Sequence, residues 1–308
     1  MRVDFDIVLP LGYRVEDVLQ FHRRDTESVA EHVTPTLIRK GVMLDGVPVA
    51  LHVPLAQAGP IRCTAELDGT LTPPLRERIH AALLNILGLR IDPAPFLAAM
   101  ADDAMLGPVV RRRPGLRIVQ SASVFEALTW AIIGQQINLA FAIALRRTFI
   151  LQAGRQHSSG LWCYPEAPDA ARLTVDDLTS RKFSRAKAET LLRFASLVAS
   201  GALDLVPGPD NDMERIGQRL LAVKGIGPWT VNYGLLRGYG HGDCSLHGDV
   251  AVRAALQRLL GEETRPSIAR TEQLLQQYRP HRTMAAAHLW ASLATDEVRD
   301  ENSDDDSR

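Results

Sequence analysis

The amino-acid sequence predicts an α+β amino-terminal domain, a small antiparallel sheet with helices, followed by an all-α body. Three observations support this prediction. Apolar and polar residues alternate near the start of the chain, an Asp-Gly turn signal joins two strand-like segments, and apolar residues recur at helical spacing from residue 93 onward. The 308 residues, at roughly 100 to 200 residues per domain, allow two or three compact units.

The strands of the first domain are predicted from apolar alternation or from flanking Asp-Gly turns, and they are 3–9, 36–44, 47–53 and 61–67. The turn signals are Asp45-Gly46 and Asp68-Gly69. Helical spacing predicts a helix around 15–21. A second helix is expected to begin at Pro73, because proline is favoured in the first helical turn, and to end near Gly88. The α+β domain is therefore expected to span 1–92.

No strand pattern is visible between residues 93 and 295, where amphipathic segments alternate with Gly, Pro, Asp and Asn signals. The predicted helices are 93–106, 123–151, 174–180, 184–200, 210–222, 228–238, 249–260, 267–277 and 281–295. The end of the chain, 296–308, contains seven acidic and two basic side chains. This segment is predicted to be an acidic disordered tail.

The composition, with 46% hydrophobic and 23% charged residues, is that of an ordinary globular protein. Acidic residues among the first ten positions argue against a secretory signal, and polar residues within the most apolar segment, 125–145, argue against a membrane span. A cytoplasmic protein is therefore expected. Cys63, Cys163 and Cys244 are too far apart in sequence for a zinc knuckle or an iron–sulfur cluster. The net charge of −1 does not decide the class of partner.

The most informative stretch is LLAVKGIGPWTVNYGLL, residues 220–236, in which one helix stops at Gly225-Ile226-Gly227 and another begins at Pro228. Glycines there let the backbone turn tightly and approach a phosphate, while free amides at the next helix N-terminus point outward. Such a helix-hairpin-helix grips DNA without reading its sequence. The alternative is a tight turn between two packed helices, because a GxG pattern alone is weak evidence.

Asp249 follows Trp229 by twenty residues, in SLHGDVAVRAALQRLL, at the predicted start of an amphipathic helix. This spacing is expected to return a carboxylate toward the hairpin. Aspartate is also a common N-cap residue, which accepts hydrogen bonds from the first free amides of its helix. The two roles are compatible, so the residues alone leave both interpretations open.

Three further segments carry a resemblance: RPGLRIVQSASVFEALTWAIIGQQI at 113–137, WCYPEAPDAARL at 162–173 and YRPHRTMAAAHLWA at 278–291. Together with the hairpin, and in the same order, they make the chain resemble the helix-hairpin-helix (HhH-GPD) DNA glycosylase superfamily. The resemblance is strongest to bacterial 3-methyladenine DNA glycosylase II and extends to about residue 297. It implies that 93–295 is a helix-hairpin-helix glycosylase region, with two helical subdomains and an active-site cleft between them.

The resemblance implies a DNA base-excision repair hydrolase that cleaves the N-glycosidic bond of alkylated bases, 3-methyladenine and 7-methylguanine, flipped from duplex DNA. Asp249 matches the catalytic carboxylate. Some members also cut the backbone with a lysine amine, but Trp229 stands at that position, so a monofunctional enzyme without AP lyase activity is expected. The expected partner is double-stranded DNA with alkylated bases. The protein is expected to be a cytoplasmic, nucleoid-associated monomer.

The resemblance also implies binding residues, which are Trp229, Tyr233, Trp290 and Gln136 for the substrate and Gly225, Gly227, Thr230 and Gln135 for DNA. The aromatic residues are expected to stack on the flipped base, because electron-rich ring faces attract a cationic methylated base. The alternative is an ordinary aromatic core cluster.

Two positions depart from the family pattern. Gln136 stands where bacterial 3-methyladenine DNA glycosylase II inserts a leucine wedge, and Gly248 replaces an acidic neighbour of Asp249. Either Gln135 or Gln136 is expected to fill the position that the base vacates, unless the two form a polar helix-capping pair. Basic residues are candidate phosphate contacts, unless they form a solvated surface, and they are Arg111, Arg112, Arg113, Arg181, Lys182, Arg185 and Lys187.

No cofactor is expected to be required. The backbone carbonyls of Leu221, Val223 and Ile226 match family positions that hold a monovalent cation, so a structural Na⁺ or K⁺ is expected in the hairpin. Two other functions stay open. A non-catalytic DNA-lesion-binding protein is disfavoured by Asp249, and a glycosylase for oxidised guanine is disfavoured by Trp229 at the lysine position.

Overall fold

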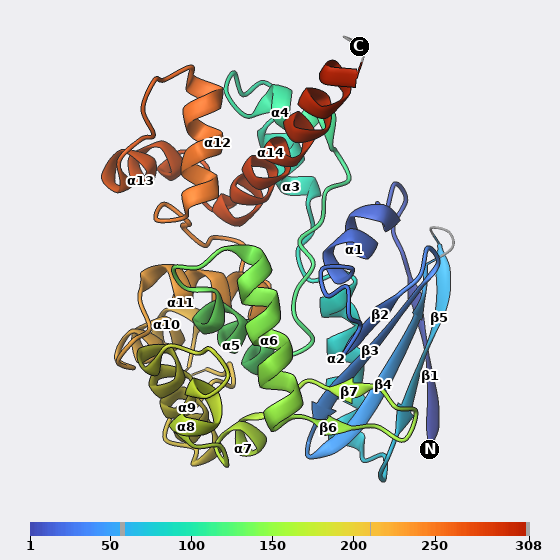
Figure 1. Ribbon diagram of the computed structural model, residues 1–308. Helices are drawn as coiled ribbons and strands as arrows, with labels where there is room; N and C mark the ends of the chain where they lie inside the picture. Colours follow the sequence, from blue (N-terminus) through green and yellow to red (C-terminus); the bar gives the residue numbers. More distant parts are fainter. Residues whose placement is uncertain (56–58, 210, 306–308) are drawn as a thin grey trace. The chain divides into compact units, whose positions relative to one another are not determined.

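The computed structural model describes residues 1–55, 59–209 and 211–305, with side chains described up to residue 293. The chain divides into two compact units. Unit 1 is formed by Met1–Arg90 and Val119–Tyr239, and unit 2 by Ile91–Ile118 and Gly240–Arg308. Figure 1 labels the elements of both units.

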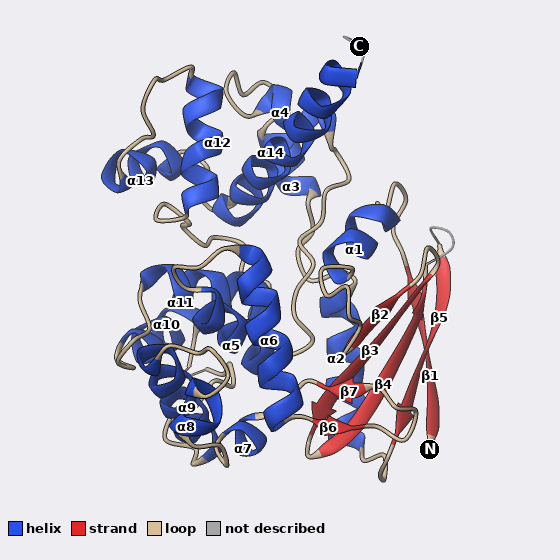
Figure 2. Cartoon of the chain, in the orientation of Figure 1, coloured by secondary structure: helices blue, strands red, loops and turns tan. Residues whose placement is uncertain are grey.

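The sheet of unit 1 has five strands in the order β1-β5-β4-β3-β2, and every neighbouring pair is antiparallel (Figure 2). Its strands are β1 (Arg2–Val8), β2 (Glu31–Val33), β3 (Leu37–Leu44), β4 (Val47–Pro54) and β5 (Pro60–Leu67). Asp45 and Gly46 join β3 to β4 with φ angles of 52° and 74°. Two residues with positive φ are what a tight type I′ hairpin turn requires. The four predicted strands are confirmed, and β2 is too short to show alternation in the sequence.

Helices α1 (Val15–His22) and α2 (Pro73–Ile86) complete the amino-terminal part, as predicted. The side chain of Thr72 caps α2 by accepting a hydrogen bond from the backbone N–H of Leu75. Ile79 and Leu83 of α2 are fully buried in the same core as the inward-facing residues of the sheet. Each such side chain contributes about 1.5–3 kcal/mol when it leaves water, so this core is the main source of stability here.

The helical part of unit 1 consists of α5 (Val124–Gly134), α6 (Leu139–Ala153), α7 (Ala167–Ala170), α8 (Val175–Thr179), α9 (Arg185–Ala199), α10 (Met213–Leu221), α11 (Pro228–Gly234) and the π-helix η1 (Leu235–Tyr239). The prediction of one helix over 123–151 is wrong, because the chain turns at 135–138. Gln136 adopts a φ of 56° in this turn. Asn138 then starts α6, since its side chain accepts a hydrogen bond from the N–H of Phe141 at 2.9 Å.

Two short strands contradict the expectation that no strand follows residue 92, because β6 (Arg155–Gln156) pairs with β7 (Trp162–Cys163). Strands of two residues are too short to show alternation. Next to β7, the N–H of Tyr164 donates to the carbonyl of Gly41 at 3.0 Å. Gly41 makes this approach to β3 possible, because a Cβ on it would lie 2.1 Å from the carbonyl oxygen of Trp162.

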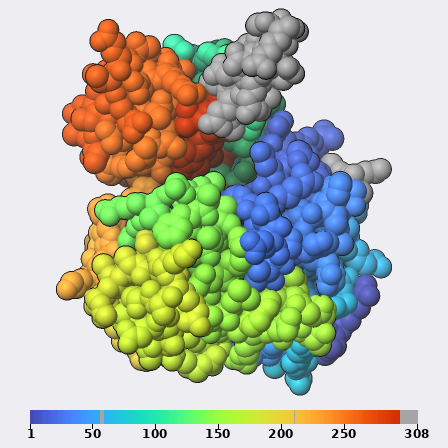
Figure 3. All heavy atoms as spheres, viewed as in Figure 1, coloured from blue at the N-terminus to red at the C-terminus, as the bar shows by residue number. Residues whose placement is uncertain are grey.

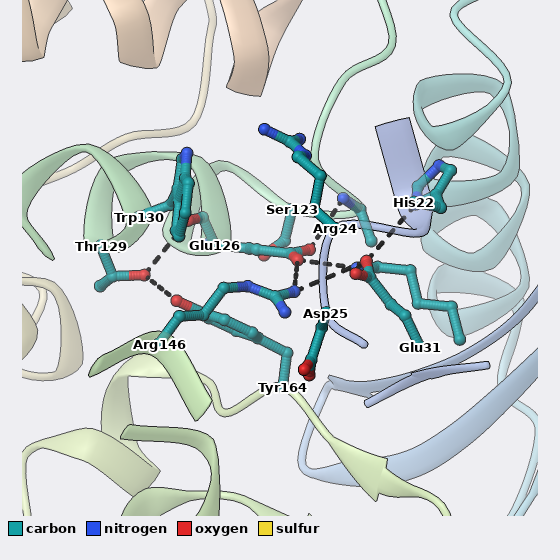
Figure 4. Close-up of polar contacts among 12 residues, drawn as sticks. His22, Arg24, Asp25, Glu31, Ser123, Glu126, Thr129, Trp130, Arg146 and Tyr164 are labelled. Carbon is teal, nitrogen blue, oxygen red and sulfur yellow. Dashed lines mark hydrogen bonds and ion pairs between the residues drawn. The ribbon is translucent and has the colours of Figure 1, made fainter. Parts of the chain in front are cut away.

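A buried group of charged side chains joins the sheet to helices α5 and α6. Lys40 of β3 contacts Glu31 of β2 and Glu126 of α5, and Arg146 of α6 contacts the same two carboxylates. Burial raises the pKa of Glu31, but the charges of Lys40 and Arg146 outweigh this effect and hold the pKa well below its usual range. Figure 4 shows Glu31, Glu126 and Arg146 pointing toward one another.

These contacts explain why the amino-terminal part and the helices that follow residue 118 form one unit. The predicted boundary at residue 92 lies close to the end of the first segment of unit 1, but the sheet does not form a unit by itself. In Figure 3 the side chains of the sheet and of the neighbouring helices of unit 1 form one continuous surface.

Unit 2 contains α3 (Ala94–Ala99), α4 (Gly107–Arg112), α12 (Val250–Leu260), α13 (Ile268–Gln276) and α14 (Arg282–Asp305). Helix α14 packs on α4, α12 and α13, and Phe96 of α3 is fully buried. The prediction of one helix over 93–106 is wrong. The side chain of Asp103 accepts hydrogen bonds from the N–H groups of Met105 and Leu106, and such local bonds compete with those of a continuous helix.

The backbone of α14 is helical up to Asp305, whereas the sequence predicts a disordered tail at 296–308. Side chains from residue 294 onward, and residues 306–308 altogether, lie outside the described residues, so the disordered tail stays a prediction. In the part of the chain that the structure describes, no helix combines the length and the apolar character that crossing a membrane requires.

Candidate functional site

The predicted hairpin connects α10 to α11 in unit 1. Gly225 has a φ of 97°, and a Cβ on it would lie 2.1 Å from the hydroxyl oxygen of Thr190. Both the backbone conformation and the packing therefore require glycine at this position. Gly227 differs, because its backbone is extended, with φ of −105° and ψ of 176°, and a Cβ on it would meet no atom within 4 Å. The fold itself does not require glycine at position 227.

Gln135, at the C-terminal end of α5, supports the hairpin. Its Nε2 donates hydrogen bonds to the carbonyl of Gly225 at 3.0 Å and to the hydroxyl of Thr230 at 2.8 Å. Thr230 is itself buried in the first turn of α11. The resemblance assigns both side chains to DNA binding, and in the structure they are bonded to each other, while Gln135 also bonds the hairpin backbone.

A buried lysine holds the turn that carries Gln136. Nζ of Lys187 in α9 donates to the carbonyls of Ile132, Ile133 and Gln135 at 3.1, 2.7 and 2.9 Å. These carbonyls lie at the C-terminal end of α5, where helical partners are missing and a positive charge is favourable. Burial lowers the pKa of Lys187. Lys187 is therefore not an exposed phosphate contact, whereas Gln136 is exposed at the tip of the turn.

Aromatic side chains gather beside the hairpin. The rings of Trp229 and Tyr233 stack with centroids 5.2 Å apart and an interplanar angle of 30°, as expected for positions four apart on a helix. Nε1 of Trp130 in α5 donates to the hydroxyl of Tyr233 at 3.0 Å. Tyr233 is buried, but both tryptophans are only half-buried, so the cluster is not a closed core. Sequence reasoning did not single out Trp130, although it lies within the segment 113–137 that carries the resemblance.

Two guanidinium groups cover ring faces near this cluster. The guanidinium carbon of Arg24 lies 3.6 Å from the ring centroid of Phe21 and 5.7 Å from that of Trp130. The guanidinium carbon of Arg237, in η1, lies 4.8 Å from the centroid of Phe21 and 5.8 Å from that of Tyr233. Arg24 and Trp130 are both labelled in Figure 4. The ring faces thus already attract positive charge within the protein.

Asp249 lies in unit 2 and is the N-cap of α12. Its Oδ1 accepts a hydrogen bond from the N–H of Val252 at 2.9 Å and another from Nε1 of Trp290 at 3.0 Å. The residue is 9% exposed. Two donors that converge on one carboxylate oxygen fix the direction of the side chain. The N-cap role is confirmed, and Trp290 lies directly against the predicted catalytic carboxylate.

Two nearby residues have other contacts. Asp243 accepts hydrogen bonds from Arg282 at 2.7 and 2.8 Å. Burial raises the pKa of Asp243, but the bonds and charge of Arg282 outweigh it and lower the pKa below its usual range. This ion pair anchors the start of α14. Nδ1 of His247 lies 2.9 Å from the hydroxyl of Ser245, so the histidine is held two residues before Asp249.

The predicted site residues fall into two groups. Unit 1 contains Gly225, Gly227, Thr230, Gln135, Gln136, Trp229 and Tyr233, and unit 2 contains Asp249 and Trp290. Direct contacts connect members within each group, through Gln135 in unit 1 and through the Trp290 indole in unit 2.

The carbonyls that the resemblance assigns to a monovalent cation follow the end of α10. Leu221 is the last residue of that helix, and carbonyls at a helix C-terminus carry partial negative charge. The carbonyl of Val223 accepts a hydrogen bond from the N–H of Ile226 at 3.0 Å, which leaves a second lone pair on that oxygen. The Na⁺ or K⁺ expected at these carbonyls stays a prediction. Among the described residues, no group of three or more His, Cys, Asp or Glu side chains is placed to hold a metal ion.

A family model described as "HhH-GPD superfamily base excision DNA repair protein" matches residues 129–281. DNA-3-methyladenine glycosylase of Bacillus subtilis is 30% identical over 221 residues, which cover 71% of this chain and 73% of that protein. YfjP of Bacillus subtilis is 31% identical over 188 residues, which cover 61% of this chain and 65% of that protein. DNA-3-methyladenine glycosylase 2 of Escherichia coli is 29% identical over 188 residues, which cover 60% of this chain and 63% of that protein.

Two solved structures share the fold. A 3-methyladenine DNA-glycosylase from Archaeoglobus fulgidus matches with a TM-score of 0.77 and 23% identity, covering 93% of this chain and 97% of that one. An 8-oxoguanine glycosylase/lyase from Clostridium acetobutylicum, bound to double-stranded DNA, matches with a TM-score of 0.68 and 14% identity, covering 93% of both chains. The family match and the 30% identity to the DNA-3-methyladenine glycosylase of Bacillus subtilis lead to one conclusion: the chain belongs to the HhH-GPD superfamily of base excision DNA repair proteins.

Proposed function

We propose that this protein is a monofunctional DNA glycosylase of the 3-methyladenine DNA glycosylase II type, which releases 3-methyladenine and 7-methylguanine from duplex DNA. The observation that carries the proposal is Asp249, a carboxylate fixed by a helix N-cap amide and by the indole of Trp290. It occupies the position that matches the family's catalytic residue. The likeness to proteins named DNA-3-methyladenine glycosylase supports the choice of substrate class.

In the proposed reaction, the bond between C1′ of the deoxyribose and the base nitrogen breaks. The base leaves with the bonding electron pair, and the sugar develops oxocarbenium character. A water oxygen then bonds to C1′ and loses a proton. The negative charge of Asp249 stabilises the developing positive charge and orients or deprotonates the water. A base methylated at N3 or N7 is cationic, so it departs as a neutral molecule without a strong general acid.

The base must leave the duplex stack before it can react. The rings of Trp229 and Tyr233 offer a stacking surface, and a cationic base is attracted to such ring faces. Gln136, exposed at the tip of its turn, is proposed to fill the vacated position and to bond the orphaned partner base. The backbone around Gly227 is proposed to contact a phosphate, since free amides at a helix start attract anions.

The absence of AP lyase activity is part of the proposal. The sequence contains only four lysines. The amine of Lys40 is bonded to carboxylates and that of Lys187 to backbone carbonyls, while Trp229 occupies the family's nucleophile position. The exposed Lys224, in the hairpin, is the amine to test. Borohydride treatment of the enzyme on damaged DNA is expected to trap no covalent adduct, and an adduct that disappears in Lys224→Ala would overturn this part.

The remaining partners follow from the same proposal. The protein acts as a monomer on double-stranded DNA in the cytoplasm, at the nucleoid. No cofactor takes part in the reaction. The carbonyls of Leu221, Val223 and Ile226 hold a Na⁺ or K⁺, which would neutralise the partial charge of the helix end beside the phosphate contact.

The test is a base-release assay on methylated duplex DNA, with free bases separated by chromatography. Free 3-methyladenine and 7-methylguanine are expected in the absence of added cofactor, and the DNA is expected to retain intact abasic sites. A duplex that contains 8-oxoguanine is the control for the oxidised-guanine alternative. No release of any base at micromolar enzyme, with tight binding to damaged DNA, would establish the non-catalytic lesion-binding alternative instead.

A further inference from the structure

Unit 1 contains a cavity of about 40 Å³ beside the aromatic cluster. The residues that line it include Phe21, Trp130, Ile143, Tyr233 and Gln120. Tyr233 also stacks on Trp229, so the cavity and the proposed base-stacking surface share one side chain. A group in this cavity therefore lies within the same aromatic cluster that is proposed to receive the base.

The acidic side chains of the cavity wall are already paired inside the protein. Glu31 and Glu126 contact Lys40 and Arg146. Asp25 is paired with an arginine outside the wall. These groups therefore have little capacity left for a ligand.

Gln120 differs from the charged wall residues. Its side chain is 0% exposed, yet within the described part of the chain neither Nε2 nor Oε1 has a hydrogen-bond partner. Its backbone is fixed, because its N–H donates to the carbonyl of Asn85 at 2.9 Å. Buried amide groups are nearly always hydrogen-bonded, because an unpaired one destabilises the fold. An unpaired amide in a residue that lines a cavity is therefore a candidate to pair with a ligand group.

The chemistry of an amide defines that ligand group. The glutamine side chain presents an N–H donor beside a carbonyl acceptor. This pair is complementary to a purine edge on which an acceptor adjoins a donor, as in the pairing of glutamine with adenine. In 3-methyladenine the ring acceptor N1 adjoins the exocyclic amine, and in 7-methylguanine the carbonyl O6 adjoins N1–H. In 3-methylcytosine the methyl group occupies the position between the amine and the carbonyl, so the matching edge is missing.

We propose that Gln120 reads the hydrogen-bonding edge of the flipped base and selects alkylated purines over 3-methylcytosine. This proposal rests on the proposed glycosylase function and names a specificity-determining residue for it. Because Gln120 is fully buried, a wall residue has to move before a base can reach its amide. Arg24 is the candidate, since its guanidinium covers Phe21 and Trp130 and, among the described residues, is paired with no carboxylate.

The test compares Gln120→Leu with the wild-type protein. Leucine has a similar size but no polar atoms, so kcat/KM for 7-methylguanine release is expected to fall about tenfold or more, the scale of one lost bidentate base contact. Binding to a duplex with an abasic site should not change, because that DNA offers no base edge. The melting temperature should stay equal or rise, since an unpaired buried amide has been removed.

Asn211→Leu is the matched control. Asn211 is also a buried amide, but its Nδ2 donates to the carbonyl of Val206 at 2.8 Å, and it lies outside the cavity wall. This variant should lower the melting temperature and leave the preference among damaged bases unchanged.

Unchanged base release in Gln120→Leu would overturn the proposal and would mean that the amide holds only a buried water. The proposal would also be overturned if Gln120→Leu lowered the melting temperature and weakened abasic-site binding as much as it reduced base release. Gln120 would then have a structural role only. If wild-type protein released no base at all, the proposed function would fail. The role of Gln120 in base recognition would then be tested by titrating free 7-methylguanine into each protein and following tryptophan fluorescence. Equal affinities of the wild-type protein and of Gln120→Leu would overturn that role.

Discussion

In unit 1 the hairpin backbone and the turn before it are supported by a buried ammonium group and a side-chain amide, whereas in unit 2 the carboxylate of Asp249 is held by one helix start and one indole. Lys187 bonds the carbonyls before Gln136, and Gln135 bonds the hairpin at Gly225. In unit 2, Asp249 receives the Val252 amide and Trp290. The arrangement in unit 1 fixes backbone that is proposed to contact DNA, and the one in unit 2 fixes a single charge.

This difference implies that substitutions in the two units should be felt in different measurements. Changes to the supporting groups of unit 1 should reduce stability or DNA affinity, because they alter packing and backbone position. Changes at the carboxylate of unit 2 should lower the rate constant of the chemical step, because a substitution can preserve the N-cap while it removes the charge.

The largest effect on stability is expected for Lys40→Met. This change removes the ammonium group between the buried carboxylates of Glu31 and Glu126 and leaves them with Arg146. A loss of about 3–5 kcal/mol in the free energy of unfolding is expected, the scale for breaking a buried charged group. Urea denaturation measures it, with Lys224→Met as the exposed control. An equal, small effect of both changes would mean that the buried charges do not hold unit 1 together.

Asp249→Asn should have the largest effect on catalysis. Asparagine retains the N-cap and can still accept the Trp290 hydrogen bond, but it lacks the negative charge that the oxocarbenium-like transition state requires. Base release should fall by at least about a hundredfold, while binding to an abasic duplex and the melting temperature should persist. Single-turnover kinetics measures the loss. Near-normal release in this variant, with loss of release in His247→Ala, would show that the active site has been assigned to the wrong residue.

The hairpin glycines provide a sharper test within unit 1. Gly227→Ala adds a methyl group to open space, so the fold should survive, while affinity for damaged and undamaged duplexes should fall together by about tenfold, as one bond to a charged phosphate is weakened. Gly225→Ala should destabilise unit 1 instead, because of its φ of 97° and the contact with Thr190. Fluorescence anisotropy and thermal melts separate the two outcomes. A loss confined to one lesion in Gly227→Ala would contradict a phosphate contact.

The smallest effect is expected for Trp290→Phe, which keeps an aromatic ring but removes the N–H that bonds Asp249. The rate constant for base release should fall by roughly fivefold, below the usual scale for a hydrogen bond to a charged group because the Val252 amide still bonds Asp249, with little change in DNA affinity. Trp290→Ala removes the ring as well and should also weaken binding of the flipped base. If the phenylalanine variant instead lost affinity and kept its rate, the indole would serve stacking alone.

Much of the fold could be predicted because its signals are local. The turn at Asp45-Gly46 needs two positive φ angles, and the sequence shows the two residue types that adopt them. The break between α5 and α6 could not be predicted, since Gln136 and Asn138 interrupt a segment that is apolar on both sides. The buried pair of Lys40 and Glu126 was equally invisible, because charged residues in a sequence are read as surface until a partner 86 residues away is known.

The candidate site shows the same division. Asp249 was singled out because a helix start and a family motif coincide in a single short segment, and its catalytic role stays a prediction. Trp130, Arg24 and Gln120 were not found, because each acquires its role from elements distant in sequence that meet around one cavity. Gln120 in particular has an ordinary sequence context, and only its burial and its unpaired amide distinguish it.

The order of the two units along the chain has a consequence for synthesis on the ribosome. Every residue of unit 1 precedes residue 240, whereas unit 2 combines 91–118 with the chain that follows Tyr239. The hairpin and its aromatic rings are therefore translated before Asp249. Phe96 is buried in the finished protein, but it becomes covered only after α14 has been translated. A product truncated near residue 240 would contain the hairpin proposed to contact DNA but would lack Asp249. Its apolar segment 91–118 would lack the rest of unit 2 and would favour aggregation.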